Sequence, residues 1–212
     1  MTTSEAPQSA PTPQDLSHRW AAVAAVQAAS AAASGREGAW CRDGLRFLHD
    51  FGGSWCALAM LPEDRALLFL WDRGAESADL TAGAPVVMDG RPAWWLEGLQ
   101  HPSLPQECDA IDAAQAWADG IWTHDAFDPD EDAQWDFVPV MCDEDAVLKL
   151  MDWVEAEAED HGLTPPDRPT IAAIVAAGPT VSAEQLAAVG FPHWDVAEGV
   201  AAARAFIHEP TG

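Results

Sequence analysis

The sequence predicts an α+β fold in which an antiparallel meander sheet is flanked by helices and followed by a helical C-terminal segment. Three short apolar runs separated by turn residues indicate the sheet, and apolar residues at helical spacing before and after them indicate the helices. A length of 212 residues suits one main domain. We expect a disordered lead-in over residues 1–14, an α+β domain over 15–162, and a helical C-terminal subdomain or lid over 163–212.

The first predicted element is a helix of about five turns that starts near Asp15. The side chain of Asp15 or of Ser17 can cap its N-terminus, and a serine–glycine pair ends it. Leu16, Trp20 and Val23 recur at helical spacing, which predicts one apolar stripe along the helix.

The meander is predicted from apolar runs with turn residues between them. The runs are Leu45–Phe51, Trp55–Leu61 and Ala66–Trp71, separated by Gly52-Gly53 and by Pro62–Arg65. Residues 85–96 fit either a further hairpin around Asp89-Gly90 or, on the Trp95 side, the start of a short helix.

An acidic stretch from Pro92 to Leu148 contains no Lys or Arg, but fourteen carboxylates and five tryptophans. Within it, Ile111–Trp122 is predicted to form a short helix. Trp135–Met141 is predicted to form a strand, which must lie at a sheet edge because Pro139 cannot donate a backbone hydrogen bond.

Helices dominate the remainder of the chain. An amphipathic helix is expected from Glu144 to His161 with Gly162 as its C-cap, followed by a linker over 163–169. Three short helices follow, over Thr170–Ala177, Ser182–Val189 and about Asp195–His208, with Ser182 and Gln185 forming a capping box. Two adjacent short helices superficially suggest a helix-turn-helix, but this region has too few basic residues to bind DNA.

The overall charge excludes several classes of partner. Ten basic residues against 35 acidic ones give a net charge of -25, which repels nucleic acids and anionic membranes. The sequence has no run of 18 apolar residues, so we expect no transmembrane helix. The four cysteines are scattered along the chain, which indicates reduced thiols in a cytoplasmic protein. A compositional bias of the whole proteome would explain the same acidity without a functional role.

The sequence motifs for catalysis, metal binding and phosphate binding are incomplete or absent in this chain. An EF-hand loop from Asp128 would need Gly and Glu where the chain has Ala133 and Pro139. The run Gly52–Cys56 lacks the last glycine of a nucleophile elbow. No cysteine pair has metal-ligand spacing, no two histidines lie four residues apart, and no phosphate loop is present. We therefore expect no catalytic residue, no cofactor and no metal.

Acidic side chains interleaved with tryptophans are typical of a surface that docks a basic partner, because carboxylates attract the cation and indoles supply buried contact area. The predicted partner-binding residues are Trp122, Asp125, Asp128, Asp130, Glu131, Asp132, Trp135 and Asp136. Trp117, Trp122 and Trp135 each fit either such a surface or ordinary packing.

The runs Leu45–Leu58 and Arg65–Arg73 resemble the central segment of the SUKH superfamily of bacterial immunity proteins. That segment has a strand ending in an acidic-glycine turn, a second strand, and a third strand closed by a Trp-Asp pair, here Trp71-Asp72. The resemblance covers about 30 residues. It implies an α+β fold and a protein without enzymatic activity that neutralises a cognate toxin, often a nuclease; no binding residues carry over.

Three hypotheses for function follow. The first is an immunity or antitoxin-like protein that occludes a basic toxin or other cationic protein. The second is an enzyme or small-ligand binder with a pocket lined by tryptophans and carboxylates. The third is a scaffold or regulatory module whose charge has no specific role.

Overall fold

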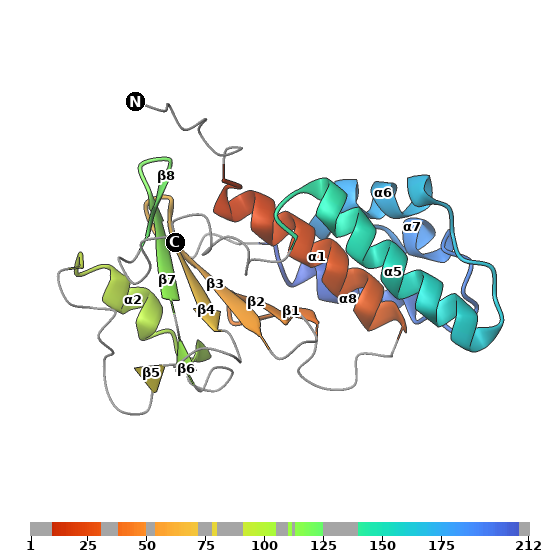
Figure 1. The fold of residues 1–212 in the computed structure, drawn as a ribbon, viewed down its shortest axis with the longest axis horizontal. Helices are drawn as coiled ribbons and strands as arrows, with labels where there is room; N and C mark the ends of the chain where they lie inside the picture. The colour runs from red at the N-terminus through yellow and green to blue at the C-terminus, as the bar shows by residue number, and fades with distance from the viewer. Residues whose placement is uncertain are drawn as a thin grey trace, which may run out of the picture.

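The chain forms an antiparallel sheet with a layer of long helices on one face and a short helix on the other (Figure 1). This confirms the predicted α+β class with its meander sheet and helical C-terminal segment. The computed structural model describes residues 10–30, 38–49, 54–71, 78–79, 91–104, 110–111, 113–124 and 140–207.

Six strands pair in the order β1-β2-β3-β4-β7-β8, each antiparallel to its neighbour. They are β1 (Ala39–Arg42), β2 (Leu45–His49), β3 (Trp55–Leu61), β4 (Arg65–Trp71), β7 (Ala113–Ala118) and β8 (Ile121–His124). Strands β5 (Ala78–Asp79) and β6 (Ala110–Ile111) form a separate pair. The three predicted apolar runs are therefore the central strands β2, β3 and β4.

The predicted helix over Ile111–Trp122 is wrong, because this segment supplies β6, β7 and the start of β8. Its alanines favour a helix locally, but pairing β7 with the buried strand β4 satisfies its backbone hydrogen bonds and buries Ala114 and Ala116. The turn to β8 is Asp119-Gly120, with φ values of 54° and 81°. Positive φ at both turn positions is the geometry that Asp-Gly favours in a two-residue hairpin.

Two other strand predictions fall largely outside the described residues. Residues 85–90 of the predicted hairpin are not described, and the Trp95 side forms the short helix α2 (Trp95–Leu99). Residues 135–139 of the predicted edge strand are not described either, and Val140 and Met141 belong to no strand.

Helix α1 (Pro13–Ser30) starts two residues earlier than predicted. Thr12 is its cap: its Oγ1 accepts a hydrogen bond from Asp15 N (3.1 Å), and Asp15 Oδ2 accepts one from Thr12 N (3.0 Å). Pro13 suits the first helical position because its missing N–H would have no partner there. Ser17, the other predicted cap, is buried and accepts a hydrogen bond from Arg46.

The sequence predicted one apolar stripe along α1, but the buried surface of this helix is wider than one stripe, because α1 is buried almost all round. It lies between the sheet and the C-terminal helices, as Figure 1 shows. Helix α8 (Val196–Arg204) approaches so closely that a Cβ at Gly199 would lie 2.5 Å from the carbonyl oxygen of Ala25. The buried residues of α1 are Pro13, Leu16, Ser17, Trp20 to Gln27, Ala29 and Ser30.

The remaining helices follow the predicted pattern. They are α5 (Asp143–His161), α6 (Arg168–Ala177), the short η3 (Gly178–Thr180), α7 (Ala183–Ala187) and α8. Gly162 caps α5 with φ of 65°, and the predicted capping box of Ser182 and Gln185 is present. These helices share one buried cluster with α1 and the sheet. The domain boundary at residue 162 stays a prediction.

Strand residues alternate between two cores. On β4, Leu68 and Leu70 face the long helices, whereas Leu67 and Phe69 face α2. Arg46 is also buried and donates hydrogen bonds to Ser17 Oγ (2.7 Å) and to the carbonyl oxygens of Gly44 (2.8 Å) and Phe206 (3.3 Å). Burial lowers the pKa of its guanidinium.

None of the helices in the described ranges is long and apolar enough to cross a membrane.

Candidate functional site

Of the eight predicted partner-binding residues, only Trp122 lies in the described part of the chain. The other seven are Asp125, Asp128, Asp130, Glu131, Asp132, Trp135 and Asp136, and all lie outside it.

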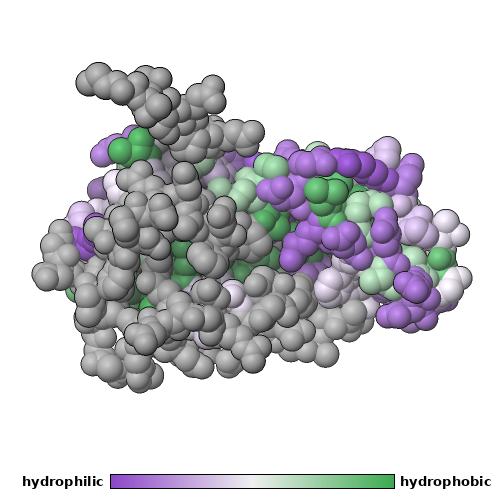
Figure 2. Space-filling model, viewed as in Figure 1, coloured by the Kyte–Doolittle hydropathy of each residue, from purple (hydrophilic) through white to green (hydrophobic). Residues whose placement is uncertain are grey.

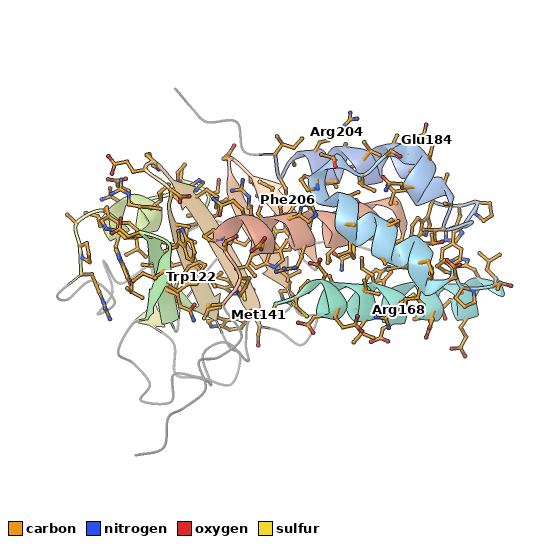
Figure 3. The ribbon with its side chains drawn as sticks, turned by 90° about the horizontal axis from the view of Figure 1, so that it is seen from above. Trp122, Met141, Arg168, Glu184, Arg204 and Phe206 are labelled. Carbon is orange, nitrogen blue, oxygen red and sulfur yellow. The ribbon has the colours of Figure 1, made fainter. Side chains whose placement is uncertain are left out.

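Trp122 is held by contacts within the protein. Its Nε1 donates a hydrogen bond to the carbonyl oxygen of Pro11 (2.7 Å), and its ring meets the Trp117 ring edge-on at 5.5 Å between centroids. It lies on β8 at the sheet end of the molecule, where Figure 3 labels it. Trp117 is only 8% exposed, so its ring belongs to the core. Trp122 is half-buried, and its role as a partner anchor stays a prediction.

The outer side of α5 carries a concentration of exposed acidic side chains. Figure 2 shows hydrophilic side chains running over this helix. Its exposed carboxylates are Asp143, Glu144, Asp145, Asp152, Glu155, Glu159 and Asp160.

The negative charge of the first turn of α5 is partly neutralised by two arginines. Asp143 Oδ1 accepts a hydrogen bond from Arg19 Nε at 2.7 Å, and Glu144 pairs with Arg168. Asp145 forms a capping box with Cys142, whose Sγ accepts from Asp145 N at 3.4 Å. These three carboxylates also lie at the positive end of the helix dipole.

Further along α5, Asp152, Glu155 and Glu159 form a stripe that we call the α5 acidic stripe. Its members are three and four residues apart and follow one another at about 4.5 and 6 Å along the helix axis. No ion pair to them occurs within the described ranges. Leu148, four residues before Asp152, is 48% exposed. An exposed apolar side chain therefore continues the acidic stripe at its N-terminal end.

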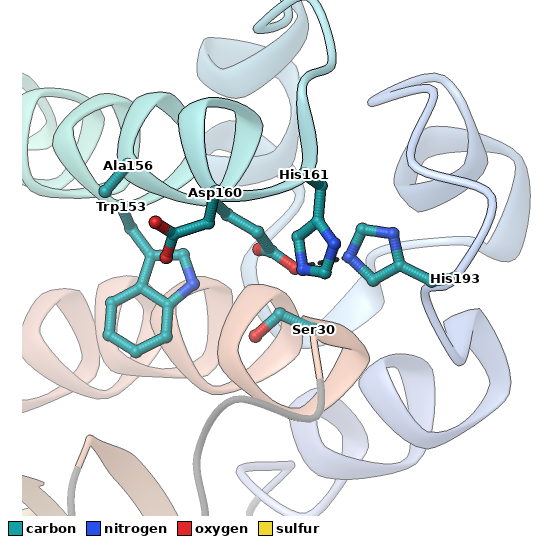
Figure 4. Close-up of a pocket in the computed structure, with 7 residues that line it drawn as sticks. Ser30, Trp153, Ala156, Asp160, His161 and His193 are labelled. Carbon is teal, nitrogen blue, oxygen red and sulfur yellow. Dashed lines mark hydrogen bonds and ion pairs between the residues drawn. The ribbon is translucent and has the colours of Figure 1, made fainter.

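A pocket of about 430 Å³ opens beside the C-terminal end of α5. Helix α5 supplies most of its wall, the last residue of α1 adds a hydroxyl, and the loop before α8 adds an imidazole (Figure 4). The residues that line it are Ser30, Trp153, Ala156, Glu157, Asp160, His161 and His193.

Glu157 is the buried carboxylate of this pocket, with 8% of its side chain exposed. Its Oε1 accepts a hydrogen bond from Trp194 Nε1 (2.8 Å) and lies 2.7 Å from His193 Nε2. Its Oε2 is buried and has no hydrogen-bond partner among the residues that the structure describes. An unpaired carboxylate oxygen costs free energy in such a place, because it has lost its hydration.

Two imidazoles meet beside this carboxylate. The rings of His161 and His193 lie 4.2 Å apart between centroids, at 31° to each other. Figure 4 shows the two rings adjacent, whereas the carboxylate of Asp160 lies on the Trp153 side. Ligand atoms of Glu157, His161 and His193 all lie within 4.8 Å of one another, which makes this trio a possible metal-binding group.

The loop that carries His193 is anchored to both neighbouring helices. The backbone N of Asp195 donates to the carbonyl oxygen of Ala29 at the end of α1 (2.8 Å), and Trp194 bonds to Glu157 on α5. Phe191 stacks on the His193 ring with 5.8 Å between centroids. The position of His193 is therefore set by packing and hydrogen bonds on three sides.

This cluster was not predicted from the sequence, because neither a cysteine pair nor two histidines four residues apart mark it. Glu157 and His161 are themselves four residues apart on one helix face, and this mixed pair is a pattern that could have been found. His193 lies far along the chain, and only the fold brings it to them.

The chain matches no family model, no curated protein and no solved structure. The resemblance to SUKH immunity proteins therefore stays a prediction.

Proposed function

We propose that this protein is an acidic immunity or antitoxin-like protein of the bacterial cytoplasm, which binds and occludes a basic toxin or another cationic protein. The observation that carries the proposal is the α5 acidic stripe, Asp152, Glu155 and Glu159, with exposed Leu148 beside it. The SUKH-like segment over residues 45–73 favours the same class of protein, and the net charge of -25 favours a cationic partner.

Repulsion between the carboxylates of the α5 acidic stripe destabilises the helix when no partner is bound. Like charges three or four residues apart destabilise a helix by about 0.2–0.5 kcal/mol per pair. A Lys- or Arg-rich partner surface would remove this repulsion and gain long-range attraction during approach. Leu148 would supply apolar contact area at the edge of the charged surface. Nucleic acid carries the wrong charge for this face.

The test uses the basic proteins encoded next to this chain in its genome, each purified as an inactive variant. Association rates with the full chain are measured by stopped-flow at low and high salt. We expect one basic neighbour to bind, with an association rate that falls steeply as salt increases. If no basic neighbour binds, the proposal is wrong.

Two variants with the same charge change locate the binding face. Asp152→Asn, Glu155→Gln and Glu159→Gln together remove the stripe, and we expect the low-salt association rate to fall about tenfold or more. Glu97→Gln, Asp119→Asn and Glu198→Gln are the matched control, because all three lie outside α5 and are exposed. Equal losses in both triple variants would show that only total charge matters, and that α5 is not the face.

A small-ligand binder is the second candidate, and the pocket beside α5 favours it. Trp153, Glu157 and Asp160 give this pocket an indole and two carboxylates, a combination that binds small cations. Calorimetric titration with choline tests it against Trp153→Leu. Saturable binding that the variant loses would support this function, and the absence of saturable heat would contradict it.

A further inference from the structure

We propose that Glu157, His161 and His193 form a Zn²⁺ site with one coordination position open to the pocket. The proposal is independent of partner docking, because it concerns the inner wall of the pocket and not the α5 acidic stripe. Zn²⁺ is bound in proteins by imidazole nitrogen and carboxylate oxygen, and two histidines with one glutamate are a set that holds it with a fourth position free.

The distances fit a site that closes on the ion. At the bond lengths that Zn²⁺ makes to nitrogen and oxygen, tetrahedral ligand atoms lie about 3.4 Å apart. The contact between Glu157 Oε1 and His193 Nε2 is already shorter, at 2.7 Å, and all three donor groups lie within 4.8 Å. His161 is exposed in the last turn of α5, so a small rotamer change of its side chain brings its ring nitrogen into range.

The unpaired oxygen of Glu157 is an independent indication of a ligand. Oε1 is fixed by Trp194 Nε1 and by His193, which orients the carboxylate as an outer hydrogen bond orients a metal ligand. Within the described part of the chain, no donor reaches Oε2, although the side chain is more than nine-tenths buried. A cation bound at the carboxylate would compensate this oxygen. Coordination through His193 Nε2 would displace the proton from its hydrogen bond to Oε1.

The donor set selects among cations. Mg²⁺ and Ca²⁺ prefer all-oxygen ligands and would favour the exposed carboxylates of this chain instead. Two imidazoles beside one carboxylate suit Zn²⁺ better. Asp160, the nearest further carboxylate on α5, lies on the Trp153 side of the pocket, away from the two rings (Figure 4). The open position therefore faces the pocket, where water or an entering ligand would complete the coordination.

The experiment titrates the full chain with ZnCl₂ by calorimetry in excess MgCl₂, which occupies the surface carboxylates. It uses a Cys142→Ser background, because the exposed thiol of Cys142 could also bind zinc and serine retains the helix cap. We expect one tight Zn²⁺ per chain, and Co²⁺ in its place should give the visible absorption of a tetrahedral site.

His161→Gln is the deciding variant, because His161 makes no hydrogen bond within the described ranges and its loss should leave the fold intact. We expect His161→Gln and His193→Gln each to weaken Zn²⁺ binding at least about tenfold. Glu157→Gln is a poorer probe, since Glu157 also binds Trp194.

His101→Gln and Glu159→Gln are the matched controls. His101 lies beyond α2, and Glu159 is exposed on the same helix as Glu157, outside the trio. Both should bind Zn²⁺ as the background does. If His161→Gln and His193→Gln bind Zn²⁺ with unchanged affinity, or if the controls lose it equally, the trio is a structural cluster and the proposal is wrong. Because no partner protein is present, this result does not depend on whether the docking function holds.

Discussion

Gly199→Ala should destabilise the protein although alanine is the better helix former. Gly199 lies in α8 where this helix packs on α1. An added Cβ would lie 2.5 Å from the carbonyl oxygen of Ala25, 2.8 Å from Leu186 Cδ1 and 2.9 Å from Ala29 Cβ. The Ala25 oxygen is a backbone atom of α1, and Ala29 Cβ is bonded directly to the backbone. Neither atom can move away by a rotamer change, as the end of a long side chain can.

The net effect is a difference between two opposing terms. Replacing glycine by alanine in a helix gains about 1 kcal/mol of helix propensity. Overpacking a buried contact costs about 1–3 kcal/mol, and three contacts below 3 Å place Gly199 at the upper end of that range. We therefore expect the free energy of unfolding to fall by about 2 kcal/mol, which corresponds to a Tm lower by about 4–8 °C in a chain of this size.

Urea denaturation followed by tryptophan fluorescence measures this change, with Gly98→Ala as the control. The three atoms nearest to a Cβ at Gly98 all belong to the Leu67 side chain, with Cδ1 the closest at 2.5 Å. The end of that side chain can shift, so Gly98→Ala should lose less than 1 kcal/mol, an approximate bound set by the same propensity gain. If Gly199→Ala is as stable as the wild type, then α1 and α8 do not pack this closely.

Three further predictions concern buried polar groups, a helix cap and the thiols. The amide of Gln115 is fully buried and has no hydrogen-bond partner among the described residues, so Gln115→Met should raise the free energy of unfolding by about 1–2 kcal/mol in urea denaturation; a loss would show that the amide is satisfied. Hydrogen bonds from Thr170 lower the pKa of the Asp167 carboxyl at the start of α6. This carboxylate therefore stabilises the fold at and above the ordinary pKa of aspartate, and the stabilisation is lost as pH falls through the lower folded value. A carboxyl NMR titration should find that lower pKa in the wild type and a pKa closer to the ordinary value in Thr170→Val, which removes the hydroxyl hydrogen bond but keeps the backbone N–H bond of residue 170 to Asp167 Oδ1. Burial raises the pKa of the Cys41 thiol, so iodoacetamide should alkylate Cys41 more slowly than the exposed Cys142, measured by peptide mass spectrometry; equal rates would contradict the burial of Cys41.

The parts of the fold that could be predicted are those whose structure follows from the pattern of neighbouring residues in the sequence. The strands β2, β3 and β4 are short apolar runs between turn residues, and α5 shows an apolar period with glycine at its end. The segment Ala113–Ala118 could not be assigned from propensity, because its alanines favour a helix and only pairing with β4 makes it a strand. The Asp119-Gly120 pair is nevertheless typical of a two-residue hairpin turn, and it could have predicted this hairpin from the sequence.

The candidate sites divide in the same way. The acidic character of α5 is visible in the sequence, and so is the spacing of Glu157 and His161 on one face of it. The third member, His193, is 32 residues further along the chain, and no periodicity links it to α5. Its place depends on the hydrogen bonds of Trp194 and Asp195 to two other helices, and these form only when the tertiary structure does.

The burial of α1 on almost every side has a consequence for biosynthesis. The sheet that covers one side of α1 is made soon after it, but α8, which covers the other, is completed about 170 residues later. At ribosomal rates of about 5–20 residues per second, that interval is roughly 10–30 s. During this time the surface of α1 that packs on α8 has no partner, and contacts between such distant segments form slowly. Efficient production of this protein should therefore depend on a chaperone that shields α1 until the chain is complete.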